Sequence, residues 1–521
     1  MYRKATILVV VLVLMWLSLG SAWADVKLPS IFGDHMVLQC DQPIRIWGWA
    51  DPGERVTVRI AQDSKTVTTS PQGRWQVTLD ALAAGKAVSV TVQGNNTLTL
   101  NDVLTGEVWI CSGQSNMQWS FERSITNGEA EVAAANFPKI RLITVPRKTA
   151  TSPQPDFQGQ WQACTPDSVK SFSAVGYFFG RTLNRELNRP IGLISTNWGG
   201  TRVEAWTSMG DLNQLPAAHP ILDRWQEMDD AYDPIQVRKQ YEAALEKWEK
   251  ASAKAKAEGK KAPGKPRMQA DPQASPHYPA NLYNGMIAPL VPLSLQGAIW
   301  YQGESNVGRA YQYRELFPLM IRNWRRDFQD AGMPFGFVQL APYARYGGDR
   351  EGALAELWEA QLMTLKNLDN IGMAVTTDIA TVNNIHPPNK QDVGKRLGLW
   401  ALASIYGENI IYSGPIYQGC ERHGQAMSIS FSHVGTGLNT RDGQVPSHFT
   451  IAGADKAFHP AQAKIVGSRV VVSSEEVADP VAVRFAWSNT AEPNLQNKEG
   501  LPASPFRTDD WPGVTVDNYR P

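Results

Sequence analysis

The chain has 521 residues, which exceeds one ordinary domain and predicts two or three. Its 50 basic and 50 acidic side chains balance, so the net charge gives no long-range attraction to nucleic acid or to an anionic membrane. The four cysteines lie far apart without a Cys-x-x-Cys pair, which argues against a zinc site.

The first 24 residues have the three parts of a secretory signal. Arg3 and Lys4 precede an apolar stretch at 5–19, and Ala-Trp-Ala at 22–24 has the small-x-small pattern that precedes cleavage. We therefore expect a mature chain that begins at Asp25 and a periplasmic or secreted location. No later apolar run is long enough to cross a bilayer, so we expect no membrane attachment after cleavage.

Residues 25–105 carry β signals only. Runs at 44–49, 55–60 and 88–92 alternate apolar and polar residues, and turn sequences such as Asp-Pro-Gly at 51–53 separate such runs. This pattern predicts a small β-sandwich domain of immunoglobulin-like size.

Residues 106–412 alternate apolar, strand-like runs with helical patterns such as 175–187 and 311–328, which predicts an α/β domain with a mainly parallel sheet. A stretch at 225–268 interrupts this rhythm. Its part at 236–261 is rich in Lys, Glu and Ala, and because its charges are balanced we expect a solvated helical insertion on the active-site side and no nucleic-acid binding.

After residue 412 the pattern returns to β. Runs at 426–431, 469–472 and 481–485 are rich in β-branched and aromatic residues. Residues 413–521 are therefore expected to form a C-terminal β-domain.

A candidate nucleophile follows the apolar run at 108–111. In the Gly-Gln-Ser-Asn-Met motif at 113–117, Gly113 lets the backbone bend sharply and Ser115 then stands at the start of a helix. Free backbone N–H groups and the helix dipole can stabilise an oxyanion at that place. Ser115 is the residue we expect to attack an acyl group.

Three more polar clusters follow strand-like runs: Asn-Trp-Gly-Gly-Thr at 197–201, Gln-Gly-Glu-Ser-Asn at 302–306 and Ile-His-Pro-Pro-Asn-Lys at 385–390. Open parallel sheets gather their ligand sites beyond the carboxyl ends of the strands. A Ser, a Gly pair, an amide and a His brought to one edge would make an acyl-transfer site. The sequence has no phosphate loop, dinucleotide fingerprint or metal-ligand cluster, so we expect no cofactor and no metal.

In these four blocks the sequence resembles the SGNH-type hydrolases, in particular the sialate O-acetylesterase branch and related bacterial carbohydrate acetylesterases. Segments at 31–39 and 500–509 resemble the same branch, so the resemblance covers nearly the whole chain. It implies an SGNH-hydrolase-like α/β fold, with a parallel sheet flanked by helices and accessory β-sandwich domains before and after it. It also implies removal of acetyl groups from sugars.

A Ser nucleophile needs a neutral imidazole within hydrogen-bond reach, and His386 is the expected base. SGNH enzymes usually place an Asp three residues before the His, but this sequence has Asn383 there, and Asn384 is also uncharged. We expect Asp378, at the end of the preceding strand, to orient the imidazole. A Ser–His dyad with an amide or backbone partner is the alternative.

The oxyanion hole is expected to use the backbone N–H of Ser115 and a backbone N–H of Gly199 or Gly200. A side-chain amide is the expected third donor. The family usually supplies an Asn, and here Gln302 is the first choice and Asn306 the second.

Gln114, Arg202 and Glu304 are the candidate substrate contacts. Arg202 and Glu304 could equally form an ion pair that only braces two loops.

The leading functional hypothesis is an exported carbohydrate O-acetylesterase acting on plant cell-wall polysaccharides (xylan or xyloglucan) or on sialic acid. The 18 tryptophans and the accessory β-domains favour the plant-type glycans, whereas a cation such as Arg202 would suit the sialic acid carboxylate. The alternative from another class is a carbohydrate-binding protein with a degenerate, inactive hydrolase domain, and the missing Asp at position 383 is its main support.

Overall fold

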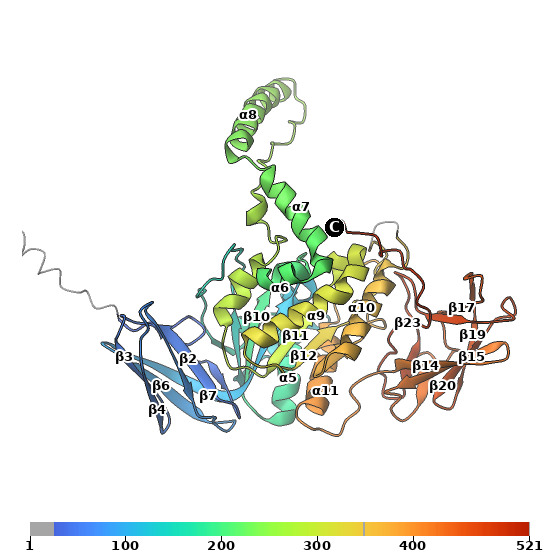
Figure 1. Cartoon of the computed structure of the whole chain (residues 1–521), viewed down its shortest axis with the longest axis horizontal. Helices are drawn as coiled ribbons and strands as arrows, with labels where there is room; N and C mark the ends of the chain where they lie inside the picture. The colour runs from blue at the N-terminus through green and yellow to red at the C-terminus, as the bar shows by residue number, and fades with distance from the viewer. Residues whose placement is uncertain (1–24, 347–349, 520–521) are drawn as a thin grey trace, which may run out of the picture.

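The computed structural model describes residues 25–346 and 350–519, so the predicted signal sequence at 1–24 lies outside the described residues. A β-domain, a central α/β domain and a second β-domain follow one another along the chain (Figure 1). The predicted fold class, a helix-flanked parallel sheet with accessory β-domains before and after it, is confirmed. Within the described ranges, no helix is both long and apolar enough to cross a membrane.

The N-terminal β-domain follows from the alternating pattern of its strands. Side chains of β5 (Arg74–Leu79) are exposed and buried in turn, and this strand pairs antiparallel with β2 (Ile44–Trp49). Such alternation buries one face of a sheet and leaves the other to solvent. A second sheet contains β1 (Val37–Gln39), β3 (Arg55–Ile60), β4 (Asp63–Thr68), β6 (Ala87–Gln93) and the first half of β7 (Thr97–Gly113).

The 17-residue strand β7 belongs to both the first and the central domain. Its first half pairs antiparallel with β6, and its second half, from Glu107 to Gly113, pairs with the parallel strands of the central sheet. The predicted boundary between residues 105 and 106 therefore falls inside a continuous strand. As a result, the N-terminal domain is joined directly to the strand that ends at the nucleophile motif.

The central sheet has the strand order β13-β12-β11-β7-β10-β8-β9. All neighbours from β13 to β8 are parallel, and only the edge strand β9 is antiparallel. The carboxyl ends of the parallel strands therefore share one edge of the sheet. The strands besides β7 are β8 (Phe137–Thr144), β9 (Gln162–Cys164), β10 (Ile191–Asn197), β11 (Gly297–Tyr301), β12 (Phe335–Val338) and β13 (Ile371–Ala374).

Helices cover both faces of this sheet. The register pairs Trp109 of β7 with Gly297 of β11, so Trp109 and Trp300 point to opposite faces. On the first face Trp109 contacts Phe179 and Trp400, and on the second Trp300 contacts Trp324. The helices that supply these rings are α5 (Ala174–Leu187) and α11 (Lys390–Ser404) on the first face, and α9 (Ala310–Asp327), which packs on α10 (Ala353–Asn367), on the second.

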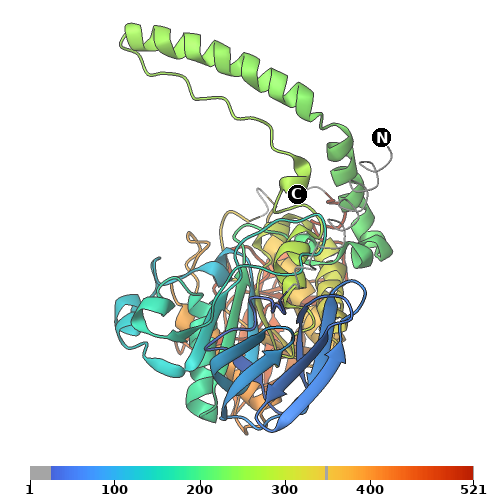
Figure 2. The ribbon, with the colours of Figure 1, turned by 90° about the vertical axis from the view of Figure 1, so that its left-hand side faces the viewer.

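A helical arm projects from the central domain (Figures 1 and 2). It begins after α7 (His219–Asp230) and consists of α8 (Pro234–Ala257) and an extended returning segment. The indole N–H of Trp248 donates to the Pro263 carbonyl at 2.8 Å, which holds this segment along the helix. The stretch at 234–268 has ten basic and four acidic side chains, so the prediction of balanced charges was wrong and the arm is basic.

The short helices connect the larger elements around the sheet. They are α2 (Ser115–Gln118), α3 (Gly128–Ala133), α4 (Pro166–Val169) and α6 (Met209–Gln214), with 3₁₀ segments that include η1 (Val203–Trp206), η3 (Pro272–Ala274) and η6 (Glu304–Arg309) and the π-helical turn η4 (Tyr283–Ile287).

The C-terminal β-domain has its own hydrophobic core, in which the rings of Phe449, Phe485 and Phe506 pack against one another. Its sheets are antiparallel, as the alternating patterns predict. Its strands are β14 (Ile416–His423), β15 (Ala426–Ser432), β16 (Leu438–Thr440), β17 (Phe449–Ala452), β18 (Phe458–Pro460), β19 (Gln462–Val466), β20 (Arg469–Ser473), β21 (Ala482–Phe485), β22 (Leu495–Asn497) and β23 (Phe506–Arg507).

Candidate active site

Ser115 stands at the first position of α2, directly beyond the carboxyl end of β7. Gly113 makes this turn with φ of +138°, and a Cβ there would lie 2.2 Å from the Tyr301 carbonyl oxygen, so only glycine fits. Ser115 is partly exposed, and its hydroxyl has no hydrogen-bond partner in the part of the chain that the structure describes. The hydroxyl is thus available to a ligand.

A pocket of about 630 Å³ opens at Ser115. Arg123 and Arg147 line it, and neither guanidinium pairs with a carboxylate among residues 25–346 and 350–519. The other lining residues are Gln118, Trp119, Ser120, Glu122, Thr144, Val145, Pro146, Ser171, Ser173, Ser195 and Asn197. The lining is mostly polar, which suits a hydroxyl-rich ligand.

The ring of His386 stacks on Trp119, with centroids 4.0 Å apart and planes inclined by 15°. Trp119 directly follows α2, so this contact brings the imidazole beside the helix of Ser115. Asn116 fixes the same loop, because its side-chain amide donates to the Ile385 carbonyl at 2.9 Å. The structure therefore brings the predicted nucleophile motif and the predicted base together.

Burial, together with the positive charges of Lys390 and Arg123, lowers the pKa of His386 to about 4. The imidazole is therefore neutral at neutral pH. A neutral ring can accept the proton that a serine hydroxyl must lose when it attacks a carbonyl.

Asp378 does not reach the imidazole. Both of its carboxylate oxygens accept from the guanidinium of Arg396, at 2.7 and 2.6 Å, and no hydrogen bond joins it to His386 within the described ranges. The expectation that Asp378 orients the imidazole is corrected here, because α11 supplies a cation that holds the carboxylate elsewhere. Asn384 accepts the backbone N–H of His386 at 2.9 Å, so it holds the loop, and Asn383 makes no contact with the ring among the described residues.

Among the predicted oxyanion-hole donors, the backbone N–H groups of Ser115 and Gly200 have no acceptor within residues 25–346 and 350–519. Gly199 packs against Ser115, because a Cβ on Gly199 would lie 3.2 Å from the Ser115 Cβ. Its own N–H, however, donates to the side-chain oxygen of Gln118 at 2.7 Å. The loop of β10 thus lies beside the nucleophile, with Gly200 rather than Gly199 free to donate.

The predicted amide donors are committed to other groups. The fully buried Gln302 donates to Asn306 at 2.6 Å and to the Thr201 carbonyl at 3.1 Å. Asn306 in turn donates to Glu204 at 3.0 Å. This corrects the assignment of either amide to the oxyanion hole: they brace the loops that follow β10 and β11.

Glu304 and Gln114, predicted to contact substrate, lie beneath the site. Glu304 accepts from the Asn116 amide at 2.5 Å, and Lys390 donates to the Asn116 side-chain oxygen. Burial raises the pKa of Glu304 and lowers that of Lys390. Gln114 is buried, and its side-chain oxygen accepts the Gly303 N–H at 3.3 Å. Both side chains are therefore engaged in buried contacts that hold the segment around Ser115. The prediction that they contact substrate is corrected.

Arg202 differs from these two residues. It forms no ion pair with Glu304, and its buried Nε has no partner in the described part of the chain. The buried acid nearby, Glu204, is paired with Arg309 instead. Arg202 thus keeps a guanidinium without a carboxylate partner among the described residues.

Sequence reasoning missed four residues that shape the site: Asn116, Gln118, Trp119 and Lys390. Three of them belong to the nucleophile motif or directly follow it, and Lys390 ends the histidine block. Lys390 is fully buried and its ammonium therefore needs a polar partner, but neither the burial nor the partner can be read from the sequence. The partner, Asn116, lies 274 residues earlier in the chain, and spacing alone does not reveal it.

The candidate site thus combines a serine on a strand-to-helix turn, a neutral histidine stacked on the residue that follows the serine's helix, and free backbone donors. Residues 273–401 match the family described as carbohydrate esterase, sialic acid-specific acetylesterase. The chain is 32% identical over 428 residues to sialate O-acetylesterase of Rattus norvegicus, covering 75% of this chain and 76% of that protein. It is 29% identical over 550 residues to the Homo sapiens sialate O-acetylesterase, covering 94% and 96%.

Among solved structures, a carbohydrate acetylesterase from Xanthomonas citri is similar with a TM-score of 0.79 and 37% identity, covering 94% of this chain and 100% of that chain. The chain belongs to the sialate O-acetylesterase family and is a carboxylic ester hydrolase. These similarities do not favour the alternative of an inactive carbohydrate-binding protein.

Proposed function

We propose that the protein is an exported carbohydrate O-acetylesterase that forms an acetyl-enzyme on Ser115. The stacking of His386 on Trp119 carries this proposal, because it brings a neutral base next to the helix that presents a free serine hydroxyl.

In the proposed reaction the Ser115 oxygen attacks the acetyl carbonyl carbon while His386 takes its proton. The backbone N–H groups of Ser115 and Gly200 donate to the oxyanion that forms. The bond to the sugar oxygen then breaks, and His386 returns the proton to that oxygen. Water attacks the acetyl-enzyme by the same route and releases acetate.

The proposed machinery is a Ser–His dyad rather than a triad. The ring of His386 is held by stacking, and its loop is held by Asn116 and Asn384, so no carboxylate is needed to fix its orientation. A dyad lacks the carboxylate that stabilises an imidazolium, and the depressed pKa of His386 agrees with that environment.

The proposed substrate is an acetylated glycan, either a plant cell-wall polysaccharide such as xylan or xyloglucan, or acetylated sialic acid. The relatives are named for sialate and for carbohydrate acetyl esters, which supports the wider class. Arg123 and Arg147 line the pocket without a carboxylate partner among the described residues, which suits a glycan that carries a carboxylate. The test is acetate release from acetylated xylan, xyloglucan, pectin and sialic acid.

Ser115→Ala is the direct test of the mechanism. It removes one hydroxyl from a surface turn, so the variant should fold as the wild type does and lose acetate release and p-nitrophenyl acetate hydrolysis. Activity above about one hundredth of wild type would contradict the assignment, since loss of a catalytic nucleophile costs far more than that.

Export is proposed from the signal-like sequence at 1–24. Sequencing the N-terminus of protein recovered outside the cytoplasm should find Asp25 first. An N-terminus that retains the apolar stretch would contradict cleavage.

A further inference from the structure

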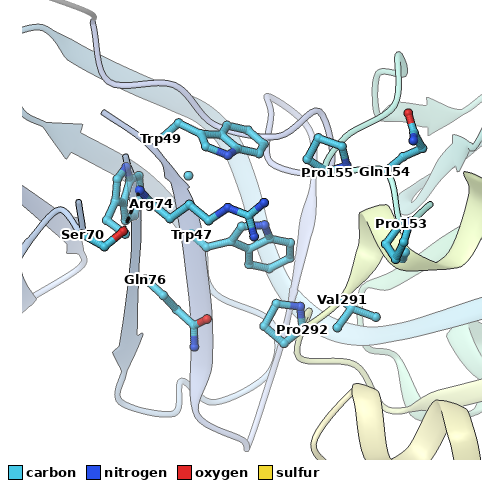
Figure 3. A pocket seen from close by; sticks show the side chains of 13 residues that line it. Trp47, Trp49, Ser70, Arg74, Gln76, Pro153, Gln154, Pro155, Val291 and Pro292 are labelled. Atoms are coloured by element: carbon cyan, nitrogen blue, oxygen red, sulfur yellow. Dashed lines mark hydrogen bonds between the residues drawn. The ribbon is translucent and has the colours of Figure 1, made fainter. Parts of the chain in front are cut away.

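A second cleft, of about 420 Å³, lies between the N-terminal β-domain and the central domain. Figure 3 shows its two walls: Trp47 and Trp49 of β2 on one side, with Pro155 and Pro292 of the central domain opposite them. Arg74 extends between the two indole rings from the neighbouring strand. The cleft is separate from the residues that line the Ser115 pocket.

The sheet register assembles this wall. Trp49 lies opposite Arg74 and Trp47 opposite Gln76, so all four side chains point to the outward face, while alternate residues such as Trp75 are buried. Trp47 is held edge-on against Phe32, with centroids 4.7 Å apart. Partly exposed indole rings on an outward sheet face give a flat apolar surface on which a ligand ring can lie.

The charge of the cleft is positive. Arg74 is the one charged residue that lines it, and its guanidinium has no partner among the described residues. At the rim, the Lys148 ammonium donates to the side-chain oxygen of Gln154 at 2.8 Å. No carboxylate lies among the lining residues to neutralise either cation.

We propose that this cleft is an accessory binding site for an acidic saccharide, namely a uronic-acid-bearing segment of the glycan. The apolar face of a sugar ring stacks on Trp47 or Trp49, and the carboxylate pairs with the planar guanidinium of Arg74, which can accept it in a bidentate manner. The identity of this ligand as the enzyme's own polymer rests on the proposed function, whereas saccharide binding by the cleft does not.

One loop connects the cleft to the pocket of the nucleophile. Arg147 lines the pocket and Pro153 lines the cleft, so five residues lie between the two and the segment spans at most about 22 Å. Backbone bonds hold this loop in place, from the Ala150 N–H to the Asn281 carbonyl at 3.2 Å and from the Gln154 N–H to the Asn284 carbonyl at 2.9 Å. A saccharide chain held in the cleft is therefore kept near the site that cleaves acetyl esters.

Binding to the full-length Ser115→Ala protein tests the proposal without turnover. Tetragalacturonate should bind, with a change in tryptophan fluorescence, and xylotetraose should bind at least about tenfold more weakly. Trp49→Ala should weaken tetragalacturonate binding severalfold, and Arg74→Gln should remove the preference for the acidic oligomer. Arg55→Gln, an exposed substitution on β3 of the same domain, is the matched control and should change nothing.

Equal affinity for the two oligomers, or binding that survives both cleft substitutions, would overturn the proposal. Trp49→Ala and Arg74→Gln in the otherwise wild-type chain should leave p-nitrophenyl acetate hydrolysis unchanged, because that ester is too small to use the cleft. Failure of the proposed function would instead appear as absent hydrolysis by the wild type, while saccharide binding by the cleft persists. The two failures are therefore distinguishable.

Discussion

At the candidate active site, the surroundings of His386 keep its imidazole neutral. Partial burial against Trp119 disfavours the charged ring, and the cations of Lys390 and Arg123 add to this effect. The ring therefore keeps its ability to accept a proton under conditions in which an exposed histidine would already be protonated.

The pH profile should reveal this shift. The lowered pKa means that the base stays neutral as the pH falls, so kcat/KM should hold through pH 6 and decline only near pH 4. Arg123→Gln removes one positive charge and should move this acidic limb to higher pH. The measurement is the initial rate of p-nitrophenyl acetate hydrolysis across pH, and the enzyme is checked to be folded at each pH. An acidic limb near pH 6.5 in the wild type would contradict the lowered pKa of His386.

Asp378 should matter for stability rather than for turnover. Its bidentate pair with Arg396 is largely buried, so Asp378→Asn should cost about 3 kcal/mol of unfolding free energy by leaving the guanidinium without its partner. Well below the melting temperature, kcat should fall only a few-fold. Urea unfolding and kcat on the same preparation separate the two effects. A loss of about 10⁴ in kcat with unchanged stability would restore Asp378 to a triad.

The sequence predicted which segments meet at the candidate site but not their contacts. The motifs of Ser115 and His386 were expected to lie together because each follows a strand of a parallel sheet, and such strands end at a common edge. Asp378 was wrong as a partner because its carboxylate meets a cation 18 residues later, on α11. Gln302 was wrong as a donor because its amide is already bonded to Asn306 and to Thr201, and Thr201 lies in the loop after another strand, which local spacing does not reveal.

Among the elements, β7 explains why the first domain boundary was hard to place. Its burial pattern changes from alternating to continuous near Thr105, which mimics the end of one domain and the start of the next. The chain nevertheless continues in one strand, because alternation suits a half-exposed sheet and continuous burial suits a parallel one. The pattern thus located the change of environment and not a break in the element.

The arm should be dispensable for folding. α8 has one buried residue, Val237, so its removal uncovers little apolar surface. Its two ends lie close together, because Asp229 of α7 accepts from Gln273 at 3.3 Å and from Tyr278 at 2.6 Å. Replacing residues 233–270 by a short Gly-Ser linker should leave the melting temperature and p-nitrophenyl acetate hydrolysis unchanged.

Calorimetry and initial rates on the two proteins check this prediction. Permuting the residues of 238–257 at constant composition provides a control that keeps the charge and length of the arm. A large fall in melting temperature on deletion would show that the arm supports the central domain.

Across the whole molecule, buried polar contacts fasten the outer parts to the central domain. Gln39 of the first domain accepts the Val108 N–H at 2.8 Å, and Arg45 donates to the Pro292 carbonyl at 2.6 Å. At the other end, Arg507 pairs with Glu359 of α10 at 2.8 Å. The parts are therefore expected to unfold together rather than as independent domains.

The segment after β23 should be essential to this cohesion. Glu356 of α10 is 1% exposed, and its carboxylate accepts from the Val514 and Thr515 backbone N–H groups and from the Thr515 hydroxyl. Asn518 also donates to the Gly308 carbonyl in η6, next to the site. Truncation after residue 509 removes these donors and should lower the unfolding free energy by about 3 kcal/mol or more.

Urea unfolding of the truncated and full chains measures this loss. Thr515→Val removes only the hydroxyl and should cost about 1 kcal/mol, while Val514→Ala keeps its backbone donor on an exposed side chain and should cost little. Glu356→Gln in the truncated chain should recover part of the lost stability, because a neutral amide is easier to bury without partners than a carboxylate. Equal stability of the truncated and full chains would show that the buried carboxylate finds other donors.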